Sequence, residues 1–262
     1  MRDSMPDSLP WMVKRSVLIA APIELVFQYF TDSERWQRWW GAGSYIHPEI
    51  GSKYLICYPN GQSASGEVLE LQSPERLVLS FGYEDAAKSI AIEGSRIIIQ
   101  LTSIPEGTIV CLEHHVATES IRDQHISGWR YQLALFANLV PEDYFASAPQ
   151  LIDDYYRAWS QAEVEARQQI LASTCDANVT FADQYGCTLE LEDLVGHVNA
   201  CAVHFPGVEL RATHAPARTQ NFFLSPWAAY LGEQVVMQGN NLFEFSPSGK
   251  MRRIVGFPAN KP

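Results

Sequence analysis

The first clear pattern of apolar and polar positions lies between Val17 and Gly41, where strand spacing gives way to helical spacing. Residues 17–19 are apolar or β-branched, which favours a half-buried strand, and Pro22 follows where a helix can begin without an N–H group. Asp32 or Ser33 is expected to cap a second short helix that ends at Gly41. That helix carries an aromatic cluster of Trp36, Trp39 and Trp40.

Strand and turn patterns alternate after residue 41. We expect an antiparallel meander with strands at 54–58, 66–72, 77–81, 96–103 and 108–116. Helical spacing returns over 119–140, where one apolar stripe can lie across the concave face of a curved sheet. Residues 141–149 have a proline at each end and are predicted to form a linker. The pattern therefore predicts a first domain over residues 1–140.

The second half of the chain begins with helical spacing over 151–173. A strand at 178–186 and a helix at 189–204 follow, and further strands are expected at 208–214, 219–224, 227–237, 241–245 and 250–257. The last two of these strands are expected to form a hairpin across the turn at 246–249, and we predict an α+β fold class with a second domain over residues 150–262.

Composition and charge narrow the classes of partner. The chain has 262 residues and a formal net charge of −11, which argues against a nucleic-acid or anionic-membrane surface. Five cysteines without C-x-x-C spacing favour reduced thiols. The N-terminal segment MRDSMPDSLP lacks an apolar stretch and no apolar run has the length of a membrane span, so we expect a cytoplasmic protein.

Residues 13–140 resemble the domain related to the activator of the 90-kDa heat-shock chaperone ATPase, a branch of the START-like (SRPBCC) helix-grip superfamily. The resemblance rests on AAPIELVFQYFTDSERWQRWWG, GEVLELQSPERLVLSF, GTIVCLEHH and the GW pair at 128–129. It implies a curved antiparallel sheet that grips a long C-terminal helix, with a hydrophobic cavity between them.

Residues 148–262 resemble the nuclear transport factor 2-like superfamily, in its polyketide-cyclase-like (SnoaL-like) and ketosteroid-isomerase-like branch. The matching pieces are YYRAW, VTFADQYG, FPG and NNLFEFSPSGKMRRIVGF. The resemblance implies an α+β cone, in which helices close on a bent sheet around a deep pocket. Relatives of this fold often pair through the sheet, so a homodimer through the second domain is expected.

The second resemblance also implies catalytic roles. Asp183 stands at the position of the general base, Tyr155 at that of a phenolic oxyanion donor, and Asn241 at that of a second donor, where the branch normally has an acid. Gln184 stands where proline is usual. The alternative is that Asp183 only braces a turn.

Aromatic residues and one histidine are expected to line the two cavities, although each could be core alone. The expected ligand-binding residues are Trp36, Trp39, Trp40, His114 and Trp129 in the first domain and Trp159, Phe181, Trp227 and Phe243 in the second. His197, Cys201 and His204 share one helix face and could hold zinc, but a core thiol and an imidazole at a helix end explain them as well. We expect no metal, and because no dinucleotide or phosphate-binding motif occurs we expect no cofactor.

Three functions remain open at this point. The leading one is binding of a small hydrophobic or amphipathic molecule in one or both cavities. The second is an isomerase- or cyclase-type reaction with Asp183 as base and Tyr155 and Asn241 as oxyanion donors. The third is a chaperone-associated interaction through the first domain.

Overall fold

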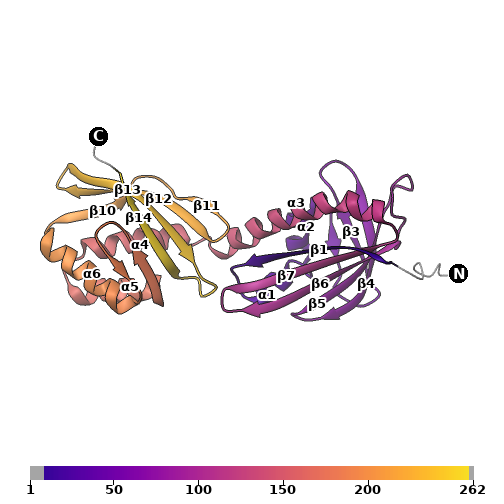
Figure 1. Cartoon of the computed structure of the whole chain (residues 1–262), viewed down its shortest axis with the longest axis horizontal. Helices are drawn as coiled ribbons and strands as arrows, with labels where there is room; N and C mark the ends of the chain where they lie inside the picture. Colours follow the sequence, from indigo (N-terminus) through magenta and orange to yellow (C-terminus); the bar gives the residue numbers. More distant parts are fainter. Residues whose placement is uncertain (1–8, 260–262) are drawn as a thin grey trace. The chain divides into compact units, whose positions relative to one another are not determined.

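The computed structural model describes residues 9–259 and divides into two compact units, Met1–Val140 and Pro141–Pro262 (Figure 1). Residues 1–8, part of the segment on which the expectation of a cytoplasmic protein partly rests, lie outside the described residues. Within residues 9–259, none of the helices combines the length and apolarity that a membrane span requires. Both units are α+β, so the predicted fold class is confirmed.

The first unit contains a seven-stranded antiparallel sheet in the order β1-β7-β6-β5-β4-β3-β2. The strands that follow the helices are a meander, as the turn signals predicted, and β1 closes the order beside β7. Their bounds are β1 (Trp11–Ile19), β2 (Tyr45–Ile46), β3 (Lys53–Cys57), β4 (Ser63–Gln72), β5 (Arg76–Tyr83), β6 (Ser95–Ile104) and β7 (Gly107–Val116).

Three helices complete this unit: α1 (Ile23–Gln28), α2 (Ser33–Trp40) and the long α3 (Glu119–Tyr144). The Asp32 side chain caps α2 by accepting from the Arg35 N–H at 2.9 Å. Phe136 of α3 packs against Tyr29 and Phe30, which lie beyond the end of α1. α3 lies against the sheet in the helix-grip arrangement (Figure 1).

Helix α3 continues past the predicted end at residue 140. Pro141 lies inside the helix, and the Phe145 N–H donates to the Pro141 carbonyl at 2.9 Å, so the helical bonding resumes after the proline. A proline removes its own N–H bond but leaves its carbonyl free to accept. The proline at residue 141 was therefore wrongly taken as a helix end.

The second unit contains three helices and a seven-stranded sheet in the order β10-β12-β13-β14-β8-β9, with β11 also paired to β12. β14 and β8 are parallel, and the other pairs are antiparallel. The helices are α4 (Ala148–Ser160), α5 (Val164–Thr174) and α6 (Leu191–His204). The strands are β8 (Cys175–Ala182), β9 (Cys187–Thr188), β10 (Val208–Ala212), β11 (Ala217–Thr219), β12 (Phe222–Leu231), β13 (Gln234–Phe245) and β14 (Met251–Pro258).

The helix predicted over 151–173 is two helices, because Arg167 holds a turn between them. Its buried guanidinium donates from Nη1 to the Gln161 carbonyl at 2.5 Å and to the Ala162 carbonyl at 3.2 Å, and from Nε to Asn199 Oδ1 at 2.7 Å. The first bond satisfies the carbonyl of Gln161, the C-cap of α4, which has no intrahelical partner, and the second satisfies the carbonyl of the residue that follows it. Gln161-Ala162-Glu163 contains no glycine or proline, so no local signal marked the break.

The strands predicted at 219–224, 227–237 and 241–245 were also divided at the wrong places. Ser225-Pro226 was taken as a break, but β12 continues through it, and Pro226 pairs with Asn240. The chain turns instead at Gly232, whose φ of 62° suits a residue without a side chain. β12 and β13 therefore form one long hairpin.

Candidate functional site

A row of polar positions crosses one face of the second sheet. Ser225 of β12 lies opposite Asn241 of β13, and Asn241 lies opposite Gly256 of β14. Asp183 directly follows β8, the strand beside β14, and a Cβ added to Gly256 would stand 3.0 Å from the Asp183 Cβ. We call Ser225, Asn241, Gly256 and Asp183 the polar row.

A buried apolar row lies beside the polar row on the same face. It consists of Phe223, Phe243, Ile254 and Phe181, which are paired across the same four strands two residues away from the polar row. Residues two apart on a strand point to the same face. The rings of Tyr155 and Tyr156 on α4 pack against Phe243, with centroids 5.3 and 5.8 Å away. The polar row therefore belongs to the face that α4 covers.

Asp183 has one oxygen engaged and one available. Its Oδ1 accepts from the backbone N–H groups of Tyr185 at 2.7 Å and Gly186 at 2.8 Å, so it does brace a turn. Among residues 9–259, no donor lies within hydrogen-bond distance of Oδ2. The side chain is partly exposed. One carboxylate thus fixes the turn and still offers an acceptor oxygen to the polar row.

Gly256 leaves the space between Asp183 and Asn241. A Cβ at this position would stand 3.2 Å from Asn241 Oδ1 and 3.8 Å from Asp183 Oδ2, in addition to its close contact with the Asp183 Cβ. Both neighbours are held by other bonds, so neither can easily move away. Absence of a side chain at residue 256 is what lets the two polar groups approach one another.

The orientation of the Asn241 amide follows from Trp227. The Trp227 Nε1–H donates to Asn241 Oδ1 at 2.9 Å, and an indole nitrogen has no acceptor capacity. Oδ1 must therefore face the indole, which turns Nδ2 away from it. Within the described part of the chain, Nδ2 has no acceptor. Asn241 can thus serve as a hydrogen-bond donor.

Tyr155 and Trp159 of α4 bring further donors to this interior. Tyr155 is fully buried, and neither its hydroxyl nor the buried Trp159 Nε1 has a hydrogen-bond partner among the described residues. The buried Ser225 Oγ also lacks one. Burial raises the pKa of Tyr155 well above 10, with Cys175 and Asp183 adding to the rise, while the nearby Trp159 N–H opposes it without reaching hydrogen-bond geometry. The phenol therefore stays protonated and can donate.

Helix α6 adds His197 and Cys201 to the edge of this region. The His197 ring lies 5.2 Å from the Phe181 ring and 5.7 Å from the Trp159 ring, and its Nε2 is 3.8 Å from Cys201 Sγ. Burial, and then the Asp183 charge, raise the pKa of the Cys201 thiol. No group of three His, Cys, Asp or Glu side chains in residues 9–259 is arranged to hold a metal ion.

The three tryptophans of α2 in the first unit are packed into its core. Trp36, Trp39 and Trp40 are at most 5% exposed. The Trp36 N–H donates to the Leu55 carbonyl at 3.1 Å and the Trp39 N–H to the Gln132 carbonyl at 3.2 Å. Of the three indole N–H groups, only that of Trp40 has no partner in the described residues. The rings of Tyr58 and Trp129 stand nearly perpendicular to the Trp40 ring, with centroids 5.9 Å from its centroid.

His114 is a buried histidine with both ring nitrogens engaged. The Trp129 Nε1–H donates to Nδ1 at 3.0 Å, so the proton sits on Nε2, which donates to Ser95 Oγ at 2.9 Å. Ser95 in turn donates to the Phe81 carbonyl at 2.9 Å. Burial, assisted by His125 and His115, lowers the pKa of His114 to about 3. The imidazole is neutral and links the sheet to α3.

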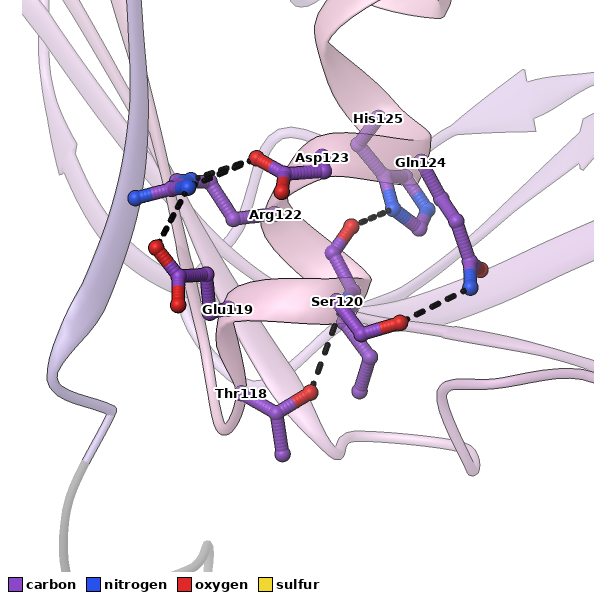
Figure 2. Close-up of polar contacts among 8 residues, drawn as sticks. Thr118, Glu119, Ser120, Arg122, Asp123, Gln124 and His125 are labelled. Atoms are coloured by element: carbon purple, nitrogen blue, oxygen red, sulfur yellow. Dashed lines mark hydrogen bonds and ion pairs between the residues drawn. The ribbon is translucent and has the colours of Figure 1, made fainter.

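His125 forms a second link between α3 and the sheet. Figure 2 shows its ring on the first turns of α3, where Nδ1 donates to the Ile121 carbonyl at 2.7 Å. Its Nε2 therefore accepts from the Tyr83 hydroxyl at 3.1 Å. Burial lowers the pKa of His125, although the Ile121 carbonyl opposes the shift. The same turns carry Arg122, paired with Glu119 and Asp123.

A surface groove of about 300 Å³ lies between α4 and β10. Its lining includes Asp153, Arg157, Glu209 and Arg211, together with Tyr156. None of the predicted site residues lines this groove. Arg157 pairs with Asp154 and Arg211 with Glu209.

The predicted site residues thus fall into two groups. Around the polar row the structure gathers Asp183, Tyr155 and Asn241 with Trp159, Phe181, Trp227 and Phe243. Those of the first unit pack against each other. Sequence reasoning missed Ser225 and Gly256, whose role depends on strand register. The alternation of Phe223, Ser225 and Trp227 was the available signal for Ser225.

Comparison with curated proteins gives no match. Among solved structures, an isomerase candidate of the SnoaL-like family from Agrobacterium tumefaciens is 19% identical, covering 42% of this chain and 96% of its own, with a TM-score of 0.41. The Aha1 dimer from Colwellia psychrerythraea is 18% identical over an alignment that covers 47% of this chain and 90% of the Aha1 chain, with a TM-score of 0.40. CalU16 from Micromonospora echinospora is 23% identical over an alignment that covers 50% of this chain and 76% of the CalU16 chain, with a TM-score of 0.39.

A family model matches the first unit. Residues 20–140 of the chain match the family described as Activator of Hsp90 ATPase homolog 1-like protein.

Proposed function

We propose that the second unit binds a small, mostly apolar molecule that carries a hydrogen-bond-accepting oxygen. The observation that carries this proposal is the set of buried polar atoms without described partners, namely the Tyr155 hydroxyl, Trp159 Nε1 and Ser225 Oγ. Each such atom costs about 1–3 kcal/mol when left unsatisfied. Three of them against an aromatic wall favour an occupant that supplies lone pairs and fills apolar space.

The residues around these atoms differ in their exposure to solvent. Asp183, Trp159 and His197 are partly exposed, whereas Tyr155 and Asn241 are buried behind them. A ligand that approaches beside α6 meets the exposed groups first. The first unit offers fewer polar atoms to a ligand, because its predicted residues pack against one another and both ring nitrogens of His114 are already hydrogen-bonded.

Binding is tested by native mass spectrometry of the purified full chain. We expect a co-purified molecule, and we expect Tyr155→Phe with Ser225→Ala to reduce its occupancy. The matched control Tyr131→Phe changes an exposed tyrosine of α3 and should leave occupancy unchanged. Loss of ligand from the control, or full retention in the double variant, would contradict the proposal.

A proton-transfer reaction is the second candidate, favoured by the unengaged Asp183 Oδ2 in a region that also holds the buried, unpartnered Tyr155 hydroxyl and Trp159 Nε1. The carboxylate would take a proton from the carbon next to a ketone, and the C–H electron pair would form an enolate whose oxygen accepts from the buried donors. Return of the proton to another carbon completes an isomerisation. This candidate keeps the roles predicted for Asp183, Tyr155 and Asn241.

Solvent exchange tests the reaction without a known substrate. Incubation of 1-tetralone with the protein in D₂O should exchange the hydrogens next to its carbonyl for deuterium. The exchange is measured as loss of the ¹H NMR signal of these hydrogens. Asp183→Asn should abolish the exchange but keep the fold, because an amide Oδ1 can still accept from Tyr185 and Gly186. Asp153→Asn, at an exposed acid of α4, is the control. Equal exchange in Asp183→Asn would remove Asp183 as the base.

A further inference from the structure

Three aromatic rings contact one another beside the turn that Asp183 braces. The rings of Trp159 on α4, Phe181 on β8 and His197 on α6 have centroids between 5.2 and 5.9 Å apart. Asp183 Oδ1 accepts from the Gly186 N–H, and a Cβ added to Gly186 would stand 2.6 Å from His197 Cε1. We call Trp159, Phe181 and His197 the aromatic trio. The turn that carries the Asp183 carboxylate therefore packs on this trio.

No cationic side chain among residues 9–259 pairs with Asp183. Its Oδ1 accepts from two backbone N–H groups, and its Oδ2 has no donor within the same residues. Arg252 and Arg253 of β14, the strand beside β8, both pair with Glu244 instead. Burial raises the pKa of the Cys201 thiol, and the Asp183 charge raises it further, so the field of the carboxylate extends to α6. The carboxylate therefore lacks a counter-ion in the described part of the chain.

A carboxylate beside aromatic rings can recognise an organic cation. An ammonium group donates to a carboxylate in a charge-assisted hydrogen bond, and aromatic faces attract a cation within about 6 Å of their centroids. Asp183, Trp159 and His197 are all partly exposed, so a ligand can reach them from solvent. Resting on the proposed function, we propose that the ligand of the second unit carries a protonated amine, which pairs with Asp183 Oδ2 against the aromatic trio.

Ligands of other charge fit these groups less well. A ligand carboxylate would be repelled by Asp183, and a neutral ligand would leave that charge uncompensated beside apolar rings. A metal ion would require further ligands, and no three His, Cys, Asp or Glu side chains of residues 9–259 are arranged around one position. The buried Tyr155 hydroxyl and Ser225 Oγ remain available to an oxygen of the same molecule. The expected ligand is therefore an amphipathic amine.

This role for Asp183 differs from the base that the sequence indicates. A carboxylate oxygen that pairs with a ligand ammonium is not free to take a proton from carbon. Trp159 and Phe181, which were expected to line a hydrophobic cavity, here select the charge of the ligand, and His197 joins them. The amine proposal and the proton-transfer candidate thus exclude one another, although both require that the second unit binds a ligand.

The test compares three phenyl compounds of similar size by isothermal titration calorimetry of the full chain at pH 8. They are the cation 2-phenylethylammonium, the neutral 2-phenylethanol and the anion 3-phenylpropanoate. The ammonium should bind about 10- to 100-fold more tightly than the alcohol, which is the range for a hydrogen bond to a charged group. The propanoate should bind more weakly than the alcohol.

Variants separate the possible failures. Asp183→Asn should remove the preference for the ammonium but keep the affinity for the alcohol, because an amide Oδ1 can still accept from the turn. Asp153→Asn removes the same charge from an exposed position of α4 and should keep the preference. Trp159→Leu should lower the preference about 2- to 5-fold, through loss of one ring.

Two results would overturn the amine proposal and leave ligand binding intact. One is equal affinity of the unaltered protein for the ammonium and the alcohol, and the other is an undiminished ammonium preference in Asp183→Asn. If none of the three compounds binds the unaltered protein, the amine proposal and the binding function fail together.

Discussion

Trp227 donates its indole N–H to Oδ1 of Asn241 at 2.9 Å, across neighbouring strands of the second sheet. The bond holds Oδ1 at the indole, and the same oxygen is the amide atom that lies next to Gly256 in the polar row. It also uses the only polar atom of an indole that is 7% exposed. A structural hydrogen bond thus determines the chemistry that Asn241 presents.

A double-mutant cycle should show that the two residues are coupled. Asn241→Leu leaves the Trp227 N–H buried without a partner, whereas Trp227→Phe with Asn241→Leu removes both polar groups. We expect the double variant to be about 1 kcal/mol more stable than the sum of the single effects predicts. Urea unfolding gives the free energies. Additive effects would mean that the bond contributes nothing.

Gly256→Ala should disturb the polar row without removing any functional group. The new methyl carbon would meet Asp183 and Asn241 at 3.0 and 3.2 Å, so we expect a loss of about 1–3 kcal/mol in unfolding free energy and weaker binding of the small molecule proposed for the second unit. Gly196→Ala is the matched control, because this α6 position has open space around it and should gain about 0.5–1 kcal/mol. Similar effects at both glycines would contradict the close approach.

His114 should make the protein less stable in mild acid. Its pKa is about 3 when folded and about 6.5 when unfolded, so the unfolded chain binds the extra proton. Stability is complete above pH 6.5 and falls toward pH 3, by about 2 kcal/mol between pH 7 and pH 5. His125, whose pKa is also lowered, acts with the same sign.

His114→Gln checks this origin, since a glutamine can accept from Trp129 and donate to Ser95 without titrating. Urea unfolding at pH 7 and pH 5 should show a pH dependence about 2 kcal/mol smaller than that of the unaltered protein. An unchanged pH dependence would place the titrating group elsewhere.

Arg167→Met should cost far more stability than the same change at an exposed arginine. The buried guanidinium has three neutral acceptors, two of them carbonyls of the turn between α4 and α5, and each would lose its donor at about 1–3 kcal/mol, so we expect a loss of about 3–5 kcal/mol after partial relaxation. Arg157→Met removes an exposed ion pair with Asp154 and should cost less than about 1 kcal/mol. Thermal unfolding of both variants makes the comparison, and equal losses would refute it.

Local patterns predicted most elements because helices and strands follow spacing within one segment. The cap at Asp32, the meander of the first unit and the helix that begins at Glu119 are examples. The break after Ser160 depends on Arg167, which bonds both to the turn at Gln161 and Ala162 and to Asn199 on the distant helix α6, and no local pattern contains that information.

The candidate site was predictable only in part. Motif resemblance singled out Asp183, Tyr155 and Asn241, but the neighbours of Asn241 depend on pairing among β12, β13 and β14, which adjacent residues do not specify. The roles of Asp183, Tyr155 and Asn241, the resemblance of the second half, the cytoplasmic location and the homodimer stay predictions.

Arg167 donates to Asn199 on α6, two positions beyond His197. Its other two bonds go to backbone carbonyls directly after the end of α4, within three residues of Trp159. One side chain outside the polar row thereby sets the spacing between the two helical walls of that region. Substitutions at residue 167 therefore change how these two helices are held together without altering any residue of the polar row, and variant libraries that probe this region should include it.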